Sequence, residues 1–203
     1  MSFTILGVRV RFTIWFFAVL SVFLLIDRTG LGILGFLACL LHEAAHVAAM
    51  LLCRRRLLEI TFLPFGIRIR QESGLSKGYG AELLILAAGP ALNLLLGAVL
   101  LLAACRSCPR IAAFGIVNIF LGTFNLLPAG VLDGGGMLAL FLRWSGHDGK
   151  ADSICFIITV ILLIPLFTLG IYLFFKSRYN FTLLFTVLYI FILSIKQYGP
   201  GNA

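Results

Sequence analysis

The sequence predicts an all-α polytopic membrane protein with about six transmembrane helices and a small β element at the cytoplasmic membrane surface. Two observations predict the helices. Hydrophobic residues make up 61% of the 203-residue chain and the mean hydropathy is +1.09, whereas soluble domains are only about 45–50% apolar. These residues also gather in long runs, and roughly 20 apolar residues cross a bilayer as a helix.

The runs that we interpret as membrane spans are 12–26, 31–53, 82–104, 111–129, 153–175 and 179–195. No small-residue cleavage pattern follows the first run, so we expect it to be retained rather than removed as a signal peptide. The segments between the runs are too short to form a soluble domain. Residues 1–203 are therefore expected to form a single membrane-embedded domain with no separate soluble domain.

The net charge of +8 comes from basic residues that lie between the apolar runs rather than in one patch. This distribution argues against nucleic acid as a partner and is typical of cytoplasmic loops under the positive-inside rule. The strongest contribution comes from the loop after the second run, which holds Arg54–Arg56, Arg68, Arg70 and Lys77. We therefore expect both termini to be cytoplasmic.

The β element is predicted by two stretches that alternate in polarity, Val8–Phe12 and Ile67–Arg70. Alternation of β-branched and polar residues is typical of a strand. Both stretches fall on the side predicted to be cytoplasmic, so we expect them to pair in a small sheet. The alternative is a pair of basic interfacial loops.

The five cysteines lie mostly inside apolar runs, where cysteine serves as a small core residue. Only Cys105 and Cys108 have the two-residue spacing of a redox pair. A disulfide or redox site there is an alternative to two packing residues.

The main candidate site is the sequence His42-Glu43-Ala44-Ala45-His46, inside the second apolar run. Histidines four residues apart share one helix face, where both imidazoles can bind one metal ion. Glu43 is badly placed as a third ligand but well placed to take a proton from an attacking water. Two histidines and a glutamate at this spacing predict a zinc hydrolase. The alternative is a pair of packing histidines hydrogen-bonded to neighbouring spans.

A catalytic zinc needs a third protein ligand, and Asp133 is the better candidate. It ends an apolar run, after Pro128 and before three glycines that can turn the chain inward. An exposed aspartate in a glycine-rich turn is the alternative. The remaining histidine, His147, lies in a polar loop that looks solvated. Asn125 is a polar group in the same run as Asp133, and its amide either binds a substrate carbonyl or links helices.

These residues resemble the site-2 protease family of intramembrane zinc metalloproteases, peptidase family M50. The family pairs a His-Glu-x-x-His helix, here His42–His46, with a later Asn-x-x-Pro-x-x-x-x-Asp-Gly segment, here Asn125–Gly134. Ala88–Asn93 resembles a further hallmark of the family. Leu63–Gly66 is similar to a loop of its sporulation branch, the stage IV proteases of the FB type, which are the nearest likeness.

The resemblance implies Zn2+ bound by His42, His46 and Asp133, Glu43 as the catalytic acid/base, and Asn125 in contact with substrate. It implies cleavage of a membrane-bound protein within or next to its transmembrane segment, as in regulated intramembrane proteolysis. For the sporulation branch this would be a sigma-factor precursor in a bacterial cytoplasmic membrane. The lipid bilayer is the other expected partner.

The sequence departs from the family pattern in two places. Many members have a proline at the position of Val131, which bears on substrate fit but not on the ligands. The sporulation enzymes also carry a C-terminal cystathionine-β-synthase domain, and we expect none here. Either the substrate then differs, or a regulatory membrane partner provides the control. Two other functions stay open: a membrane metal transporter, which would have no use for Glu43, and an inactive protease-like scaffold, which usually lacks one of these residues.

Overall fold

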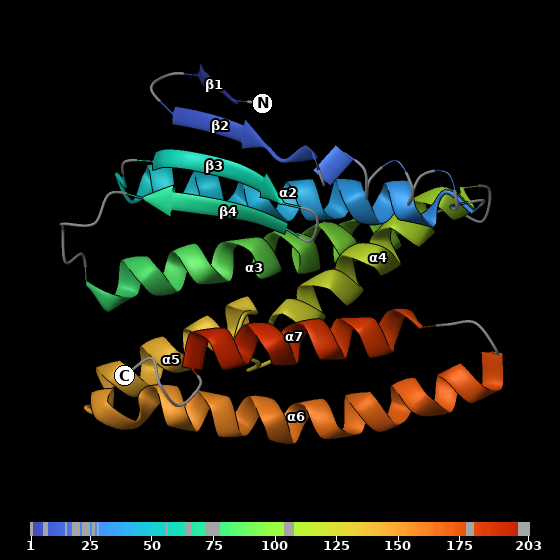
Figure 1. The fold of residues 1–203 in the computed structure, drawn as a ribbon. Helices are drawn as coiled ribbons and strands as arrows, with labels where there is room; N and C mark the ends of the chain where they lie inside the picture. The colour runs from blue at the N-terminus through green and yellow to red at the C-terminus, as the bar shows by residue number, and fades with distance from the viewer. Residues whose placement is uncertain are drawn as a thin grey trace. The chain divides into compact units, whose positions relative to one another are not determined.

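The computed structural model describes residues 2–5, 8–14, 16–17, 21, 25, 27, 29–55, 57–63, 66–71, 78–103, 108–177 and 181–198. The chain forms two compact units, Met1–Thr123 and Phe124–Ala203. Among the described residues, the first contains a sheet and three helices, the last of which ends two residues into the second unit, and the second contains three further helices (Figure 1).

In the first unit, helix α2 (Leu31–Leu52) packs against helix α3 (Tyr79–Ala103), and helix α4 (Pro109–Asn125) follows. Small residues let α3 and α4 approach closely. A Cβ added at Gly97 would lie 2.8 Å from the carbonyl oxygen of Gly115, and one at Gly115 would lie 3.2 Å from that of Gly97. Close backbone approach at small residues is the usual way in which helices pack in membranes.

The start of α2 is fixed by Asp27, which accepts hydrogen bonds at both carboxylate oxygens. Oδ1 accepts from the backbone N–H groups of Thr29 and Gly30, each at 3.0 Å, and Oδ2 accepts from that of Gly32 at 2.7 Å. The hydroxyl of Thr29 also donates to Oδ1 at 2.9 Å, and this bond is the largest cause of a lowered pKa at Asp27. The carboxylate thus satisfies N–H groups that a helix start leaves unpaired.

The sheet consists of β1 (Ser2–Ile5), β2 (Val8–Phe12), β3 (Leu57–Leu63) and β4 (Gly66–Gln71), in that spatial order. β1 and β2 are antiparallel, β2 and β3 are parallel, and β3 and β4 are antiparallel. The small β element is therefore confirmed, and Val8–Phe12 is a strand as predicted.

The expected direct pairing of the two alternating stretches is wrong, because β3 lies between them. The third residue of β3 is Glu59, which is 9% exposed. Arg11 donates to Glu59 at 3.1 Å, and the hydroxyl of Thr61 donates to the same carboxylate oxygen at 3.1 Å. A buried carboxylate needs such partners, so Glu59 ties β2 to β3.

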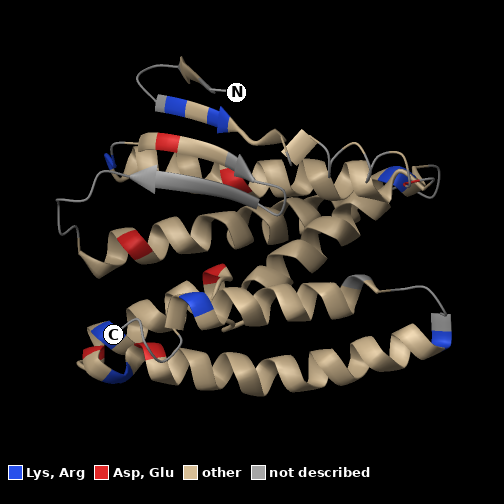
Figure 2. Ribbon diagram, in the orientation of Figure 1, with Lys and Arg blue, Asp and Glu red and all other residues tan. Residues whose placement is uncertain are grey.

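The second unit contains α5 (Asp133–Trp144), α6 (Asp148–Ser177) and α7 (Thr182–Tyr198). α6 packs against α7 around a core of Ala129, Leu163, Val187 and Ile190. The charged residues of α6 lie near its two ends, in the first five residues and in the last turn, which leaves a long uncharged body (Figure 2).

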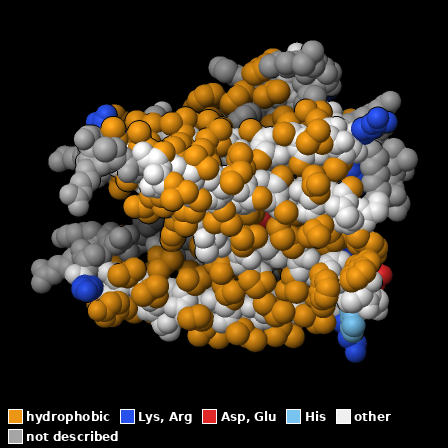
Figure 3. Space-filling model, turned by 180° about the vertical axis from the view of Figure 1, so that it is seen from behind, with side chains coloured by type: hydrophobic (Ala, Val, Ile, Leu, Met, Phe, Trp, Pro, Cys, Tyr) orange, Lys and Arg blue, Asp and Glu red, His pale blue; other side chains and the backbone are white. Residues whose placement is uncertain are grey.

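Within the described residues, three helices are long and apolar enough to cross a membrane: Leu31–Leu52, Tyr79–Ala103 and Asp148–Lys176. Leu183–Tyr198 is shorter but also apolar. Large hydrophobic side chains are exposed along these helices and cover much of the face in Figure 3. This exposure suits lipid as the solvent, and the all-α polytopic class with its multi-pass membrane location is confirmed.

Predicted boundaries differ from the structure at two places. The run 111–129 is helical only to Asn125, three residues before Pro128, which cannot continue a helix. Residues 133–144, which fall between two predicted spans, form α5. Most of the span predicted at 12–26 lies outside the described residues, as does Cys105 of the Cys105–Cys108 pair.

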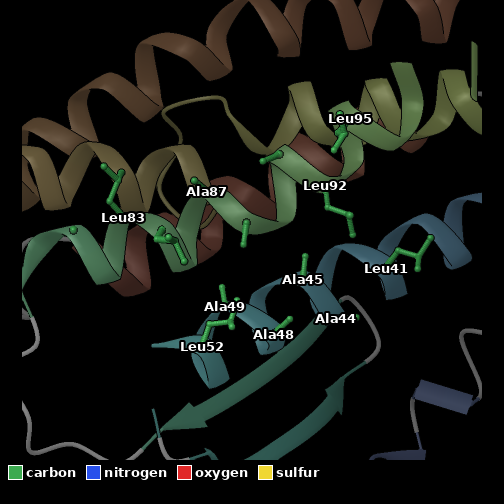
Figure 4. Close-up of a pocket in the computed structure, with 14 residues that line it drawn as sticks. Leu41, Ala44, Ala45, Ala48, Ala49, Leu52, Leu83, Ala87, Leu92 and Leu95 are labelled. Atoms are coloured by element: carbon green, nitrogen blue, oxygen red, sulfur yellow. The ribbon is translucent and has the colours of Figure 1, made fainter. Parts of the chain in front are cut away.

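An open groove of about 840 Å³ runs between α2 and α3 (Figure 4). Its lining is entirely apolar and rich in small residues: Leu41, Ala44, Ala45, Ala48, Ala49, Leu52, Gly80, Leu83, Leu84, Ala87, Ala88, Ala91, Leu92 and Leu95. Neither histidine of α2 is among the lining residues.

The contact between α3 and α4 predicts opposite effects of alanine at two glycines of α3. At Gly97 the added methyl would meet Ile119 at 2.7 Å and the Gly115 carbonyl at 2.8 Å, whereas at Gly80 nothing lies within 4 Å. Overpacking costs about 1–3 kcal/mol, while alanine is the better helix former. We expect Gly97→Ala to lower the thermal unfolding midpoint in detergent and Gly80→Ala to keep or raise it. Equal midpoints for the two variants would contradict the close packing.

Candidate metal centre

Helix α2 presents two buried imidazoles to the interior of the first unit. His42 is 5% exposed and His46 is 7% exposed. They lie one helical turn apart with their rings nearly perpendicular, at 81°. Their Nε2 atoms are 3.1 Å apart. Two nitrogen ligands of one tetrahedral zinc, each at about 2.0–2.1 Å from the metal, would be separated by roughly 3.3 Å.

The other ring nitrogens face acceptors on α3. Nδ1 of His42 lies 2.7 Å from the side-chain oxygen of Asn93, and Nδ1 of His46 lies 2.7 Å from the carbonyl oxygen of Ile85. A carbonyl oxygen only accepts hydrogen bonds, so Nδ1 of His46 is a donor. The Asn93 nitrogen donates to the Ala38 carbonyl at 3.3 Å and to Asn118 at 2.8 Å, which directs its oxygen to His42.

Because both Nδ1 atoms donate, the neutral form of each ring has its lone pair on Nε2. Two lone pairs that face each other at 3.1 Å repel unless a cation lies against both. A proton on one Nε2 would form one hydrogen bond but would place an imidazolium inside an apolar helix, which is costly. A divalent metal uses both lone pairs, and an imidazole whose Nδ1 donates to an oxygen is the usual form of a histidine ligand. The pair therefore fits a metal ion.

Gly89 of α3 keeps space open beside this pair. A Cβ at this position would press against Nε2 of His46 and would lie 2.7 Å from both Cε1 and Nε2 of His42. Such a methyl group would occupy the space next to the two nitrogens that converge. A side chain of any size is therefore excluded where the metal would be expected.

Glu43 follows His42 on α2 and is half-buried. Its side chain leaves the helix about 100° around the axis from that of His42, so it does not share the face of the two imidazoles. This separation fits a group that works beside the metal ligands rather than as one of them.

Asn125 and Asp133 belong to the second unit. Asn125 is the last residue of α4 and Asp133 is the first residue of α5, and both are half-buried. A carboxylate in the first turn of a helix is stabilised by the helix dipole. The short loop between the two residues thus joins two helix ends that carry polar side chains.

Within this loop, both backbone polar groups of Gly130 are hydrogen-bonded. Its N–H donates to the hydroxyl of Thr159 at 2.8 Å, and its carbonyl oxygen accepts from the hydroxyl of Tyr198 at 3.3 Å. Further along, a Cβ at Gly134 would press into the carbonyl groups of Leu126 and Leu127. Side chains from α6 and α7 therefore fix the backbone that leads to Asp133.

His147 lies in the exposed turn before α6, where its Nδ1 is 3.1 Å from the hydroxyl of Ser145. This solvated position agrees with the sequence interpretation. Sequence reasoning missed Asn118 and gave Asn93 only as part of a family hallmark, although both are 0% exposed. The signal was available, because each is an amide inside a long apolar run, where polar side chains usually have a specific partner.

The model of the M50B-like peptidases matches residues 15–128, which is more than half of the chain, and the model of peptidase family M50 matches residues 106–167. A curated zinc metalloprotease of Methanocaldococcus jannaschii is 31% identical over 118 residues, which are 55% of this chain and 34% of that protein. The chain therefore spans about a third of the length of this relative.

A solved structure, the site-2 protease from Methanocaldococcus jannaschii, is similar over 100% of this chain and 97% of that one. The TM-score is 0.69 and the sequence identity is 26%. The matched region 15–128 contains His42 and His46 and the two buried amides, Asn93 of α3 and Asn118 of α4. On these grounds the chain belongs to peptidase family M50, as an M50B-like member of the site-2 protease type.

Proposed function

We propose that the protein is an intramembrane zinc endopeptidase that cuts a membrane-associated protein within or next to its transmembrane segment. The observation that carries the proposal is the convergence of two Nε2 lone pairs at 3.1 Å, in a helix apolar enough to cross a membrane. A metal bound there would stand at the depth of a substrate's own membrane span. Family membership supports zinc as that metal and peptide hydrolysis as the reaction.

In this proposal, His42, His46 and Asp133 hold the zinc. Zinc supplies a Lewis acid that polarises the scissile carbonyl and makes the attacking water more acidic. Glu43 takes the proton from that water at a carboxylate oxygen and passes it to the leaving nitrogen of the cleaved peptide bond. Asn125 donates its amide N–H to the substrate carbonyl oxygen, where negative charge develops.

The proposed substrate is a single-span membrane protein whose backbone must first become extended. A transmembrane helix hides its peptide groups in its own hydrogen bonds, so it has to unwind before a peptide bond can be cut. β4 is an outer strand of the described sheet, paired there with β3. An extended segment can add to such an edge by backbone hydrogen bonds that accept many sequences.

The orientation that we propose has both termini on the cytoplasmic side of a bacterial membrane, with the sheet at that surface. The basic loops of the sequence support this orientation. Leu63–Gly66 supports a sporulation-type enzyme, and its substrate would then be the membrane-bound precursor of a sigma factor. A membrane partner would control access of that substrate.

The roles proposed for ligand and base predict different losses at two carboxylates. We expect Glu43→Gln to keep one zinc per chain and to lose cleavage of a co-expressed single-span substrate by at least 100-fold, the lower range for general acid–base catalysis. We expect Asp133→Ala to lose zinc as well as cleavage. Elemental analysis of purified protein, together with immunoblots of the substrate, measures both.

The double variant His42→Ala and His46→Ala is the control that should bind no zinc. If Glu43→Gln released zinc as readily as Asp133→Ala, Glu43 would be a ligand and the proposed roles would be wrong. A preparation without metal that still cleaves would overturn the mechanism as a whole.

The space at Gly89 predicts that a single added methyl group weakens metal binding. Gly89→Ala would place a Cβ against both imidazoles, whereas Gly35→Ala on α2 meets nothing within 4 Å. We expect Gly89→Ala to raise the zinc dissociation constant at least tenfold and Gly35→Ala to leave it unchanged. Competition with a fluorescent zinc chelator measures both constants. Wild-type affinity in Gly89→Ala would show that the metal is not held against this face of α3.

The edge of β4 predicts a difference between prolines at Arg68 and Ile69. Neighbouring N–H groups of a strand point to opposite edges, so one proline removes a bond to β3 and the other removes only an outward donor. The proline that removes only the outward donor should keep the wild-type melting temperature and the full zinc content. We expect this variant to cleave substrate several-fold more slowly. If that variant cleaved at the wild-type rate, substrate would enter by another route.

A further inference from the structure

Three helices of the first unit meet at a chain of buried amides. Asn93 of α3 and Asn118 of α4 are each 0% exposed. The Asn93 oxygen lies 2.7 Å from Nδ1 of His42, and the Asn93 nitrogen donates to the Asn118 oxygen at 2.8 Å. The Asn118 nitrogen in turn donates to the carbonyl oxygen of Phe114 at 2.8 Å.

The direction of this chain is fixed at both ends. The Phe114 carbonyl accepts only, so it fixes the Asn118 nitrogen and turns the Asn118 oxygen to Asn93. A second acceptor, the Ala38 carbonyl of α2, takes the other hydrogen of the Asn93 nitrogen at 3.3 Å. A flip of the Asn93 amide would set its oxygen against two acceptors and its nitrogen against the N–H of His42. Only one arrangement satisfies every group.

We propose that Asn93 is a positioning residue for His42, and that Asn118 locks it in the productive orientation. The inference rests on the proposed metal site, because its effect is exerted through His42 as a ligand. Asn93 accepts the Nδ1 proton and so presents the Nε2 lone pair, with the ring plane fixed, to the metal. Asn118 prevents the amide flip that would present a donor to His42 instead.

The choice of an amide has a physical reason. Histidine ligands of soluble metalloenzymes often donate to a carboxylate, which adds a negative charge. In an apolar helix bundle a further charge is costly, and the proposed ligand Asp133 with Glu43 already places two carboxylates at the site. A neutral amide supplies the acceptor without that charge. It also supplies two donors, which a carboxylate lacks, and these tie α3 to α2 and α4.

The test measures zinc affinity of the purified full chain by competition with a chelator, with zinc alone as the probe. Asn93→Leu is close in volume but accepts nothing from His42, and we expect it to raise the dissociation constant 10–100-fold, the usual effect of losing such a partner. Asn118→Leu should have a smaller effect, because the Ala38 carbonyl still directs the Asn93 amide. Asn93→Asp should bind more tightly than Asn93→Leu, because its oxygen still accepts.

Thr123→Val is the matched control on α4. Its hydroxyl donates only within its own helix, to Ile119 at 2.8 Å, so zinc affinity should stay at the wild-type value. Melting temperatures of each variant are measured with and without zinc. A positioning role predicts that Asn93→Leu reduces the increase in melting temperature that zinc causes, and that Co2+ bound in place of zinc shows a changed visible spectrum.

The result that overturns the proposal is an Asn93→Leu protein with wild-type zinc affinity and an equal loss of melting temperature in both states. Asn93 would then only hold helices together. His42→Ala separates this failure from a failure of the proposed function. If His42→Ala also kept wild-type zinc affinity, the metal site itself would be absent, and the proposed function would fall together with the inference.

Discussion

Polar side chains inside an apolar helix bundle must find their partners within the protein, and the first unit is organised by that constraint. Lipid tails offer no hydrogen-bond partners, so an imidazole or amide left unpaired against them costs several kcal/mol. His42 and His46 meet this constraint through an amide and a carbonyl of α3. Asn93 meets it through Asn118 and a carbonyl of α2. Each bond fixes one helix against another, so the hydrogen bonds that solvate the site also set its geometry.

Close approach of the backbones makes these short side chains sufficient. Histidine and asparagine reach across a helix contact only where the residues around them are small. Gly89 lets α3 lie against the imidazoles, and Gly97 and Gly115 bring α4 against α3, so that Asn118 reaches Asn93. A larger residue at any of the three would widen the contact and separate the polar groups. The small residues and the polar residues therefore act together: close helix packing positions the polar side chains, and the hydrogen bonds orient them.

The parts that sequence could predict are those that depend on local pattern. Long apolar runs predicted the ends of α2, α3, α6 and α7 to within five residues. The spacing of His42 and His46 predicted that they share one helix face. β3 was missed because Leu57-Leu58-Glu59 does not alternate at its start, where the structure has an irregular register. α5 was missed because three glycines disfavour a helix, although the backbone contacts at Gly134 and Gly135 leave no room for side chains. The role of Asn118 depends on how α4 crosses α3, and no local pattern contains that crossing.

The two units contribute to the proposed chemistry in different ways. In the first unit the orientation of both histidines is built into helix packing, and a change there would disturb the bundle itself. In the second unit Asp133 follows a loop whose one peptide, at Gly130, is held by hydroxyl groups of α6 and α7. Both bonds are buried, and Ala129 beside Gly130 packs into the core between α6 and α7, so a shift of either helix would move the loop with it. If Asp133 is the third ligand, its position depends on α6 and α7 through this loop. Control of the proposed protease would then act most easily through the last two helices rather than through the histidine pair.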